Sequence, residues 1–133
     1  KGRFEVINKK PFVVTDVAHN QESSISLAST FVENRLGGKT IAIFSILADK
    51  NIQSVVEPFM NIVDEWYITK IQSNRSASMN QIEKDLLAKK NKINVRKFDS
   101  ISLAYQEALN NSQVDDNILI FGSFLVNSEI FNN

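Results

Sequence analysis

The chain alternates short apolar runs, rich in β-branched residues, with segments whose apolar residues recur at helical spacing. The longest apolar run spans residues 40–47, and its nearly continuous apolar character is typical of a strand buried on both faces of a sheet. Other strand-like runs occur at 66–68, 93–98 and 118–121. Because strands that alternate with helices form right-handed βαβ units, the sequence predicts an α/β fold with a mostly parallel sheet and helices on both faces.

A short β-hairpin is expected ahead of this alternation, because two β-type runs at 4–7 and 12–14 flank a turn-like Asn8-Lys9-Lys10-Pro11. Gly37-Gly38 should end the first helix, and Pro58 should kink or break the second. Further helices are expected after a capping box at 78–81, after Asp99-Ser100, and at 125–131. The expected apolar face of the first helix consists of Ile25, Ala28, Phe31, Val32 and Leu36.

The composition limits the classes of function. The 133 residues fit one domain, and 15 Lys and Arg balance 15 Asp and Glu, which gives no basis for binding nucleic acid or an anionic membrane. No apolar run approaches the roughly 20 residues of a membrane span. The chain has no cysteine, which fits a reducing compartment, and we expect a cytoplasmic protein. Since it begins at Lys1 rather than Met, we expect it to be one domain, residues 1–133, of a longer protein.

Polar side chains follow three of the predicted parallel strands. Asp16 and His19 follow the strand at 12–14, Lys50 follows the long apolar run, and Ser123 follows the last strand. These residues are therefore expected to lie along the carboxyl edge of the sheet, where ligands bind in open α/β folds. An acid, an imidazole, an ammonium and a hydroxyl together suit a polar anionic ligand.

Each of these residues also has other interpretations. Asp16 could cap a helix, accept ribose hydroxyl groups, or pair with His19 as a catalytic dyad, although a spacing of three residues does not force that pairing. Lys50 could be a solvated turn residue, and Ser123 could cap the last helix.

Two other kinds of site are not supported. Gly37-Gly38-Lys39-Thr40 is similar to the end of a phosphate-binding loop, but Glu33 stands where that pattern needs glycine, and the stretch precedes a strand rather than a helix. No group of His, Asp and Glu has metal-ligand spacing, and the chain has a single histidine. We therefore predict neither a P-loop nor a metal site in this chain.

Four segments of the chain resemble, in their order and spacing, the C-terminal domain of folylpolyglutamate synthase/dihydrofolate synthase, a family within the Mur ligases. The segments are Gly2-Arg3-Phe4-Glu5, Asp16-Val17-Ala18-His19-Asn20, Leu47-Ala48-Asp49-Lys50 and Phe121-Gly122-Ser123-Phe124. The resemblance covers essentially the whole chain, and it implies a Rossmann-like sheet. Two positions depart from the family pattern: Gln21 stands where Pro is usual, and Ala48 stands where His is common.

The resemblance also implies a reaction. In these ATP-dependent ligases a central domain carries the P-loop and the Mg²⁺ ligands and phosphorylates a carboxylate of folate or dihydropteroate. The C-terminal domain brings L-glutamate, whose amine attacks the acyl phosphate. Since the central domain is absent here, this chain alone should be inactive, and it should contain no catalytic residue.

Carried over to this sequence, the resemblance places Arg3 near the ATP phosphates and Asp16 near the ribose. It places His19 and Asn20 in either the nucleotide site or the amino-acid site. Of these two sites, we expect the ATP site for both residues. Lys50 and Ser123 would hold the glutamate carboxylates. A monomer is expected. Two alternatives stay open: a Mur-type peptidoglycan ligase domain, and a stand-alone Rossmann-like binding module without catalysis.

Overall fold

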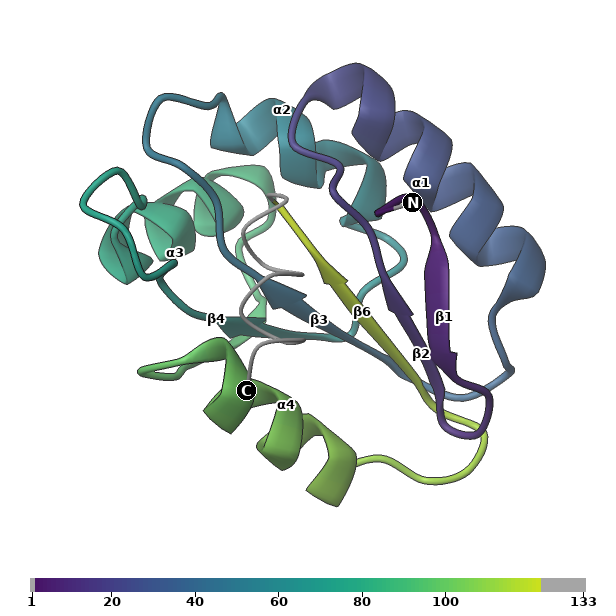
Figure 1. Ribbon diagram of the computed structural model, residues 1–133. Helices are drawn as coiled ribbons and strands as arrows, with labels where there is room; N and C mark the ends of the chain where they lie inside the picture. Colours follow the sequence, from purple (N-terminus) through teal and green to yellow (C-terminus); the bar gives the residue numbers. More distant parts are fainter. Residues whose placement is uncertain (1, 123–133) are drawn as a thin grey trace.

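The computed structural model describes residues 2–122 and contains one six-stranded sheet in the order β1-β2-β6-β3-β4-β5 (Figure 1). The strands are β1 Glu5–Asn8, β2 Phe12–Thr15, β3 Thr40–Phe44, β4 Glu65–Ile68, β5 Asn94–Lys97 and β6 Asn117–Phe121. Only the β1–β2 pair is antiparallel, and the other four pairs are parallel. The predicted α/β fold with a mostly parallel sheet is therefore confirmed.

The predicted hairpin is present, but it is part of the main sheet. β1 forms one edge, whereas β2 pairs both with β1 and with the parallel strand β6. A register shift between Val6 and Asn8 interrupts the β1–β2 pairing. β2 thus belongs to the hairpin and is also the first strand of the parallel sheet.

Helices cover both faces of the sheet (Figure 1). On one face lie α1 Gln21–Asn34, α2 Ile52–Val56, the 3₁₀ turn η1 Glu57–Phe59 and α3 Met79–Lys89, and on the other lies α4 Ile101–Asn110. The larger core, between the sheet and α1–α3, contains Phe44, Trp66 and Phe121 in mutual ring contact. The smaller core joins α4 to the opposite face of the sheet.

The helix boundaries confirm several expectations. Pro58 lies in the 3₁₀ turn that follows α2, so the second helix breaks early as predicted. Ser100 caps α4 through the N–H of Leu103. At α3, Ser78 accepts from the N–H of Gln81, which is half of the predicted capping box. The other half is missing because the side chain of Gln81 donates to Asp85 instead.

The prediction for the first helix was wrong in two respects. Ile25 and Val32 are exposed, and the buried face consists of Ser24, Leu27, Ala28 and Phe31. The helix also ends at Asn34, before Leu36. The side chain of Asn117 bonds both the N–H and the C=O of Leu36, and these bonds hold that segment out of the helix. The predicted helix at 125–131 lies outside the described residues.

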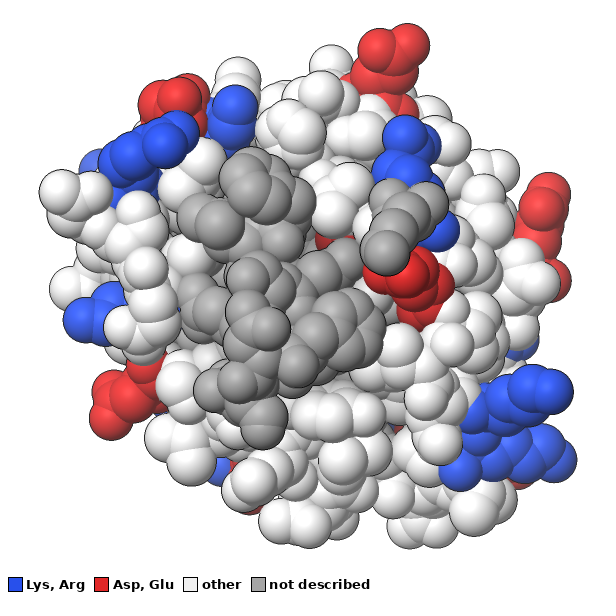
Figure 2. Space-filling view, viewed as in Figure 1, with Lys and Arg blue, Asp and Glu red and all other residues white. Residues whose placement is uncertain are grey.

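One face of the molecule mixes charges of both signs (Figure 2), and the described helices are limited in length and apolar character. On the face in Figure 2, positive and negative side chains are interspersed rather than gathered into one large patch of either sign. Within residues 2–122, no helix has the length and apolar character that crossing a membrane requires.

Candidate functional site

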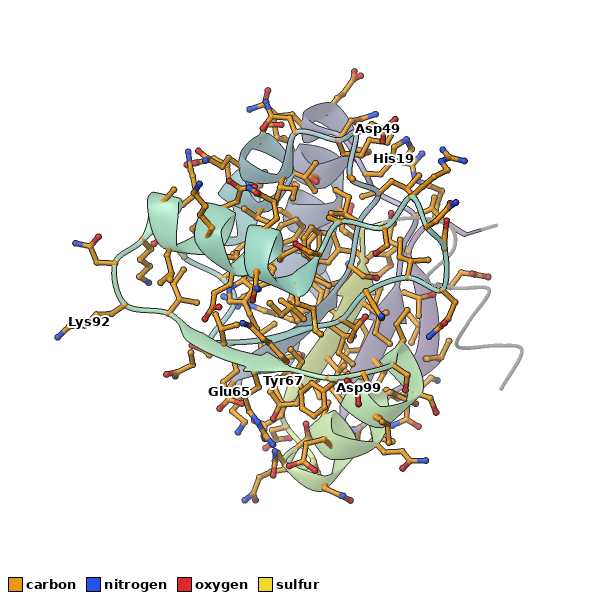
Figure 3. All side chains as sticks on the ribbon, turned by 90° about the vertical axis from the view of Figure 1, so that its left-hand side faces the viewer. His19, Asp49, Glu65, Tyr67, Lys92 and Asp99 are labelled. Atoms are coloured by element: carbon orange, nitrogen blue, oxygen red, sulfur yellow. The ribbon has the colours of Figure 1, made fainter. Side chains whose placement is uncertain are left out.

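Three neighbouring strands bring the predicted site residues to one edge of the sheet. β2 and β3 lie on either side of β6, so their carboxyl ends are roughly 10 Å apart at the usual strand spacing. Asp16 and His19 follow β2, and Lys50 follows β3. In Figure 3 His19 and Asp49 lie at the same end of the molecule, far from Lys92. The expectation of a shared edge is confirmed for these residues.

Asp16 is buried, and backbone amides occupy both of its carboxylate oxygens. The residue as a whole is only 3% exposed. Oδ2 accepts from the N–H of Phe4, and Oδ1 accepts from the N–H of Ala18, each at 2.7 Å. Short bonds from N–H groups to a carboxylate are strong. Asp16 thereby ties the N-terminal segment to the turn after β2.

The N-terminal segment, residues 2–4, lies against this turn as an arm that carries Arg3. The carbonyl of Gly2 accepts from the N–H of Val17 at 2.9 Å. Phe4 adopts a positive φ of 46°, which is rare for a bulky residue, and its ring packs near that of Phe12. Arg3 is exposed between these two anchored neighbours.

The turn that contains His19 leads directly into α1. Asn20 caps the helix by accepting from the N–H of Ser23 at 2.9 Å, and the hydroxyl of Ser23 accepts from the N–H groups of His19 and Asn20. Gln21 is the first helical residue, a position that also tolerates Pro, so its departure from the family pattern does not disturb the start of the helix.

Among residues 2–122, the imidazole of His19 makes one hydrogen bond. Its Nδ1 lies 3.0 Å from the carbonyl oxygen of Val17. Because a carbonyl can only accept, Nδ1 carries the proton in this arrangement. In the neutral ring Nε2 is then an acceptor, and in the protonated ring it becomes a second donor. The half-buried ring can therefore present either function to a ligand.

Arg3, His19 and Asn20 line one pocket of about 450 Å³. Its walls are completed by Val17, Ala18, Glu22, Ser23 and Ser26. A guanidinium, an imidazole and an amide beside the N-terminus of a 14-residue helix favour an anionic group. The pocket therefore contains three of the four residues assigned to ATP, with Asp16 buried rather than lining it.

Lys50 lines a separate pocket of about 380 Å³ between the end of β3 and the start of α3. Ser78, Gln81 and Asp85 contribute its polar walls. Within residues 2–122, the ammonium of Lys50 has no ion-pair partner. The charge is thus available to a carboxylate. Sequence reasoning did not assign Ser78, the N-cap of α3, or Gln81 and Asp85 in that helix to this site, because only the folded chain brings them next to Lys50.

Gly122 directly follows β6 at the same edge of the sheet. It has a φ of 125°, and a Cβ at this position would collide with the carbonyl oxygen of Ser45. Only glycine allows β6 and the end of β3 to approach so closely. Ser123, the predicted glutamate ligand, lies outside the described residues.

The described residues do not form a metal site. No group of three or more His, Cys, Asp or Glu side chains within 2–122 could hold an ion. The described residues therefore do not fit Mg²⁺, whose ligands the resemblance assigns to a central domain.

The sequence is similar to known ligases along almost its entire length. The model of the family described as "Mur ligase, glutamate ligase domain" matches residues 2–124. A dihydrofolate synthase/folylpolyglutamate synthase from Buchnera aphidicola subsp. Acyrthosiphon pisum is 34% identical over 128 residues, which are 96% of this chain and 30% of that protein. The Escherichia coli enzyme of the same name is 29% identical over 92% of this chain and 28% of its own length.

Solved structures also superimpose closely on this chain. E. coli FolC in complex with DHPP and ADP superimposes with a TM-score of 0.89 at 27% identity, over 98% of this chain and 30% of that chain. A bifunctional folylpolyglutamate synthase/dihydrofolate synthase with Mn, AMPPNP and L-glutamate bound gives a TM-score of 0.88 at 27% identity, with the same coverage. This chain spans about 30% of the length of these relatives. The chain belongs to the Mur ligase family, and the part of that family that it matches is the glutamate ligase domain.

Proposed function

We propose that this chain is the C-terminal domain of an ATP-dependent ligase that adds L-glutamate to a folate or dihydropteroate carboxylate through an acyl phosphate. One observation carries the proposal: the matching relatives are dihydrofolate synthase/folylpolyglutamate synthases, and the chain aligns with about 30% of each. The full-length protein would be the enzyme, and this domain alone would be inactive. It would be cytoplasmic and monomeric.

Two separate pockets at the carboxyl edge support a division of roles. Arg3, His19 and Asn20 would bind the nucleotide, with Arg3 toward the phosphates. Lys50 and Ser123 would hold the carboxylates of glutamate. Asp16 adjoins the nucleotide pocket through its bonds to Phe4 and Ala18.

The chemistry assigned to this domain is binding and orientation. ATP and Mg²⁺ would be held mainly by a central P-loop domain, where the substrate carboxylate becomes an acyl phosphate. With its carboxylates fixed by Lys50 and Ser123, glutamate would present its amine to that acyl phosphate. The amine displaces phosphate, an amide forms, and the amine loses a proton. Holding both reactants in a fixed geometry removes much of the entropic barrier to this step.

The relatives' shared folate name favours this substrate class over a Mur-type peptidoglycan precursor. The full-length enzyme should release ADP only when glutamate and a pterin carboxylate, dihydropteroate or a reduced folate, are both present. ADP release with a peptidoglycan precursor but with neither pterin would contradict the folate assignment. A full-length protein without a P-loop domain, and without ADP release, would support the binding-module alternative.

A further inference from the structure

We propose that Arg75 binds the free carboxylate of an acceptor that already carries glutamate, and that it therefore serves folate acceptors but not dihydropteroate. Arg75 lies in the β4–α3 loop, residues 69–78, which follows the carboxyl end of β4. This role rests on the proposed function, because it presupposes that Lys50 and Ser123 hold the incoming glutamate.

Backbone hydrogen bonds hold Arg75 beside the turn that carries Lys50. The N–H of Ala48 donates to the carbonyl of Arg75 at 2.7 Å. Next to this bond, Leu47 and Ser76 form an antiparallel bridge. The N–H of Lys50 closes the turn 47–50 by donating to the carbonyl of Leu47 at 3.2 Å. The backbone of Arg75 is therefore fixed at the edge of the sheet where Lys50 lies.

The β4–α3 loop has a buried interior and a positively charged exterior. Ile71 and Ala77 are buried, and the hydroxyl of Ser76 accepts from the N–H of Ile71 at 2.8 Å. Lys70 and Arg75 are exposed, and residues 69–78 include no acidic residue. A loop that is anchored in this way and exposes polar side chains is well suited to carry binding residues.

The guanidinium of Arg75 is available to a ligand. Among residues 2–122, no ion pair includes Arg75 or Lys50, whereas Arg96 pairs with Glu107 at 3.1 Å. The planar fork of an arginine binds a carboxylate through two parallel N–H bonds. Two cations on neighbouring backbone segments can thus each bind a separate carboxylate.

The proposed reaction brings more carboxylates to this edge than the incoming glutamate supplies. A folate acceptor ends in a glutamyl group with two carboxylates, of which one is activated and the other stays ionised. Because the incoming amine must reach the activated carbon, the remaining carboxylate comes close to the glutamate held by Lys50. Like charges at this distance repel each other unless a cation pairs with one of them. Dihydropteroate has only the carboxylate that is activated, so it gives Arg75 nothing to bind.

The test is steady-state kinetics of the full-length enzyme with two acceptors, dihydropteroate and a monoglutamyl reduced folate. The variants are Arg75→Ala, Arg75→Lys and Lys92→Ala. Arg75→Ala should raise the KM for the folate about tenfold, because a hydrogen bond to a charged group is lost, and it should leave the KM for dihydropteroate unchanged. Arg75→Lys keeps the charge without the fork, so its KM for the folate should lie in between.

Lys92→Ala is the control, since Lys92 is exposed and lies at the far end of the molecule from His19 and Asp49 (Figure 3). It should change neither KM. Arg75→Ala should fold like the wild type, because the side chain is exposed and the bond to Ala48 comes from the main chain.

Three results would overturn the role of Arg75. The first is a KM for glutamate that rises equally with both acceptors in Arg75→Ala, which would assign this residue to the incoming amino acid. The second is wild-type kinetics of Arg75→Ala with the folate. The third is a wild-type enzyme that uses dihydropteroate but no folate, which would leave the proposed ligase function intact. A wild-type enzyme that releases ADP with neither acceptor would overturn the proposed function and the role of Arg75 with it.

Discussion

The carboxylate of Asp16 accepts the backbone N–H of Phe4 at 2.7 Å, across twelve residues of sequence. This bond links the segment before β1 to the turn after β2. It sets the backbone on one side of the pocket lined by Arg3 and His19. The geometry of the proposed nucleotide site thus depends on a residue whose direct partners are both main-chain groups.

Replacing Asp16 with Ala should destabilise the fold, because two N–H groups lose a charged acceptor in a buried setting. We expect a loss of about 2–4 kcal/mol in the free energy of unfolding. Asp116→Ala should cost a similar amount, since its carboxylate makes the same kind of paired bonds. Urea unfolding of the chain measures both. A loss below about 0.5 kcal/mol at Asp16, the range of ordinary surface changes, would contradict the role given to these bonds.

Gly122 and Gly37 form a matched pair for backbone effects. Gly122→Ala adds a Cβ that collides with the Ser45 carbonyl, at a φ of 125°. The free energy of unfolding should therefore fall by about 1–3 kcal/mol or more. At Gly37 nothing lies within 4 Å of an added Cβ, and φ is not positive. Gly37→Ala should be neutral or stabilise by up to about 1 kcal/mol. Equal effects of the two changes, measured by thermal unfolding, would show that the close approach of β6 and β3 has been misjudged.

Tyr67 carries a buried hydroxyl at the amino end of the sheet (Figure 3). The hydroxyl accepts from Nδ2 of Asn111 at 2.8 Å and from Arg96 at 3.4 Å. Tyr67→Phe removes one acceptor from each of these donors, which both also donate to Glu107, and should cost about 1 kcal/mol. Tyr105→Phe is the control, because no hydrogen bond of its hydroxyl exists among the described residues, and its cost should stay within about 0.5 kcal/mol. Equilibrium unfolding in urea should separate the two variants.

The sequence indicated the shared edge of the sheet because parallel strands dictate it. Once 12–14 and 40–47 are assigned as parallel strands, Asp16 and Lys50 must follow carboxyl ends at the same edge. The contacts of Asp16 could not be predicted in the same way. Its bond to Phe4 requires the arm to fold back across the end of β2, and no local pattern specifies that.

The face of α1 was misassigned for a different reason. The buried stripe runs through Ser24, Leu27, Ala28 and Phe31, and it has helical spacing. Its first member is a serine whose hydroxyl has no hydrogen-bond partner among the residues that the structure describes. A search for apolar residues therefore selected Ile25 and Val32, which are 55% and 46% exposed. Burial by the sheet overrode the polarity of a single side chain.

The central claim, that one edge of this domain binds both glutamate and ATP, is tested most directly by steady-state titration of both substrates in the full-length enzyme. Lys50→Ala should raise the KM for glutamate about tenfold or more with little change for ATP, because a lost charge-assisted bond is worth at least a factor of ten. Arg3→Ala should raise the KM for ATP instead, and Lys92→Ala, at the far end of the molecule, should change neither (Figure 3). Wild-type kinetics for both substrates in Lys50→Ala and Arg3→Ala would contradict the account.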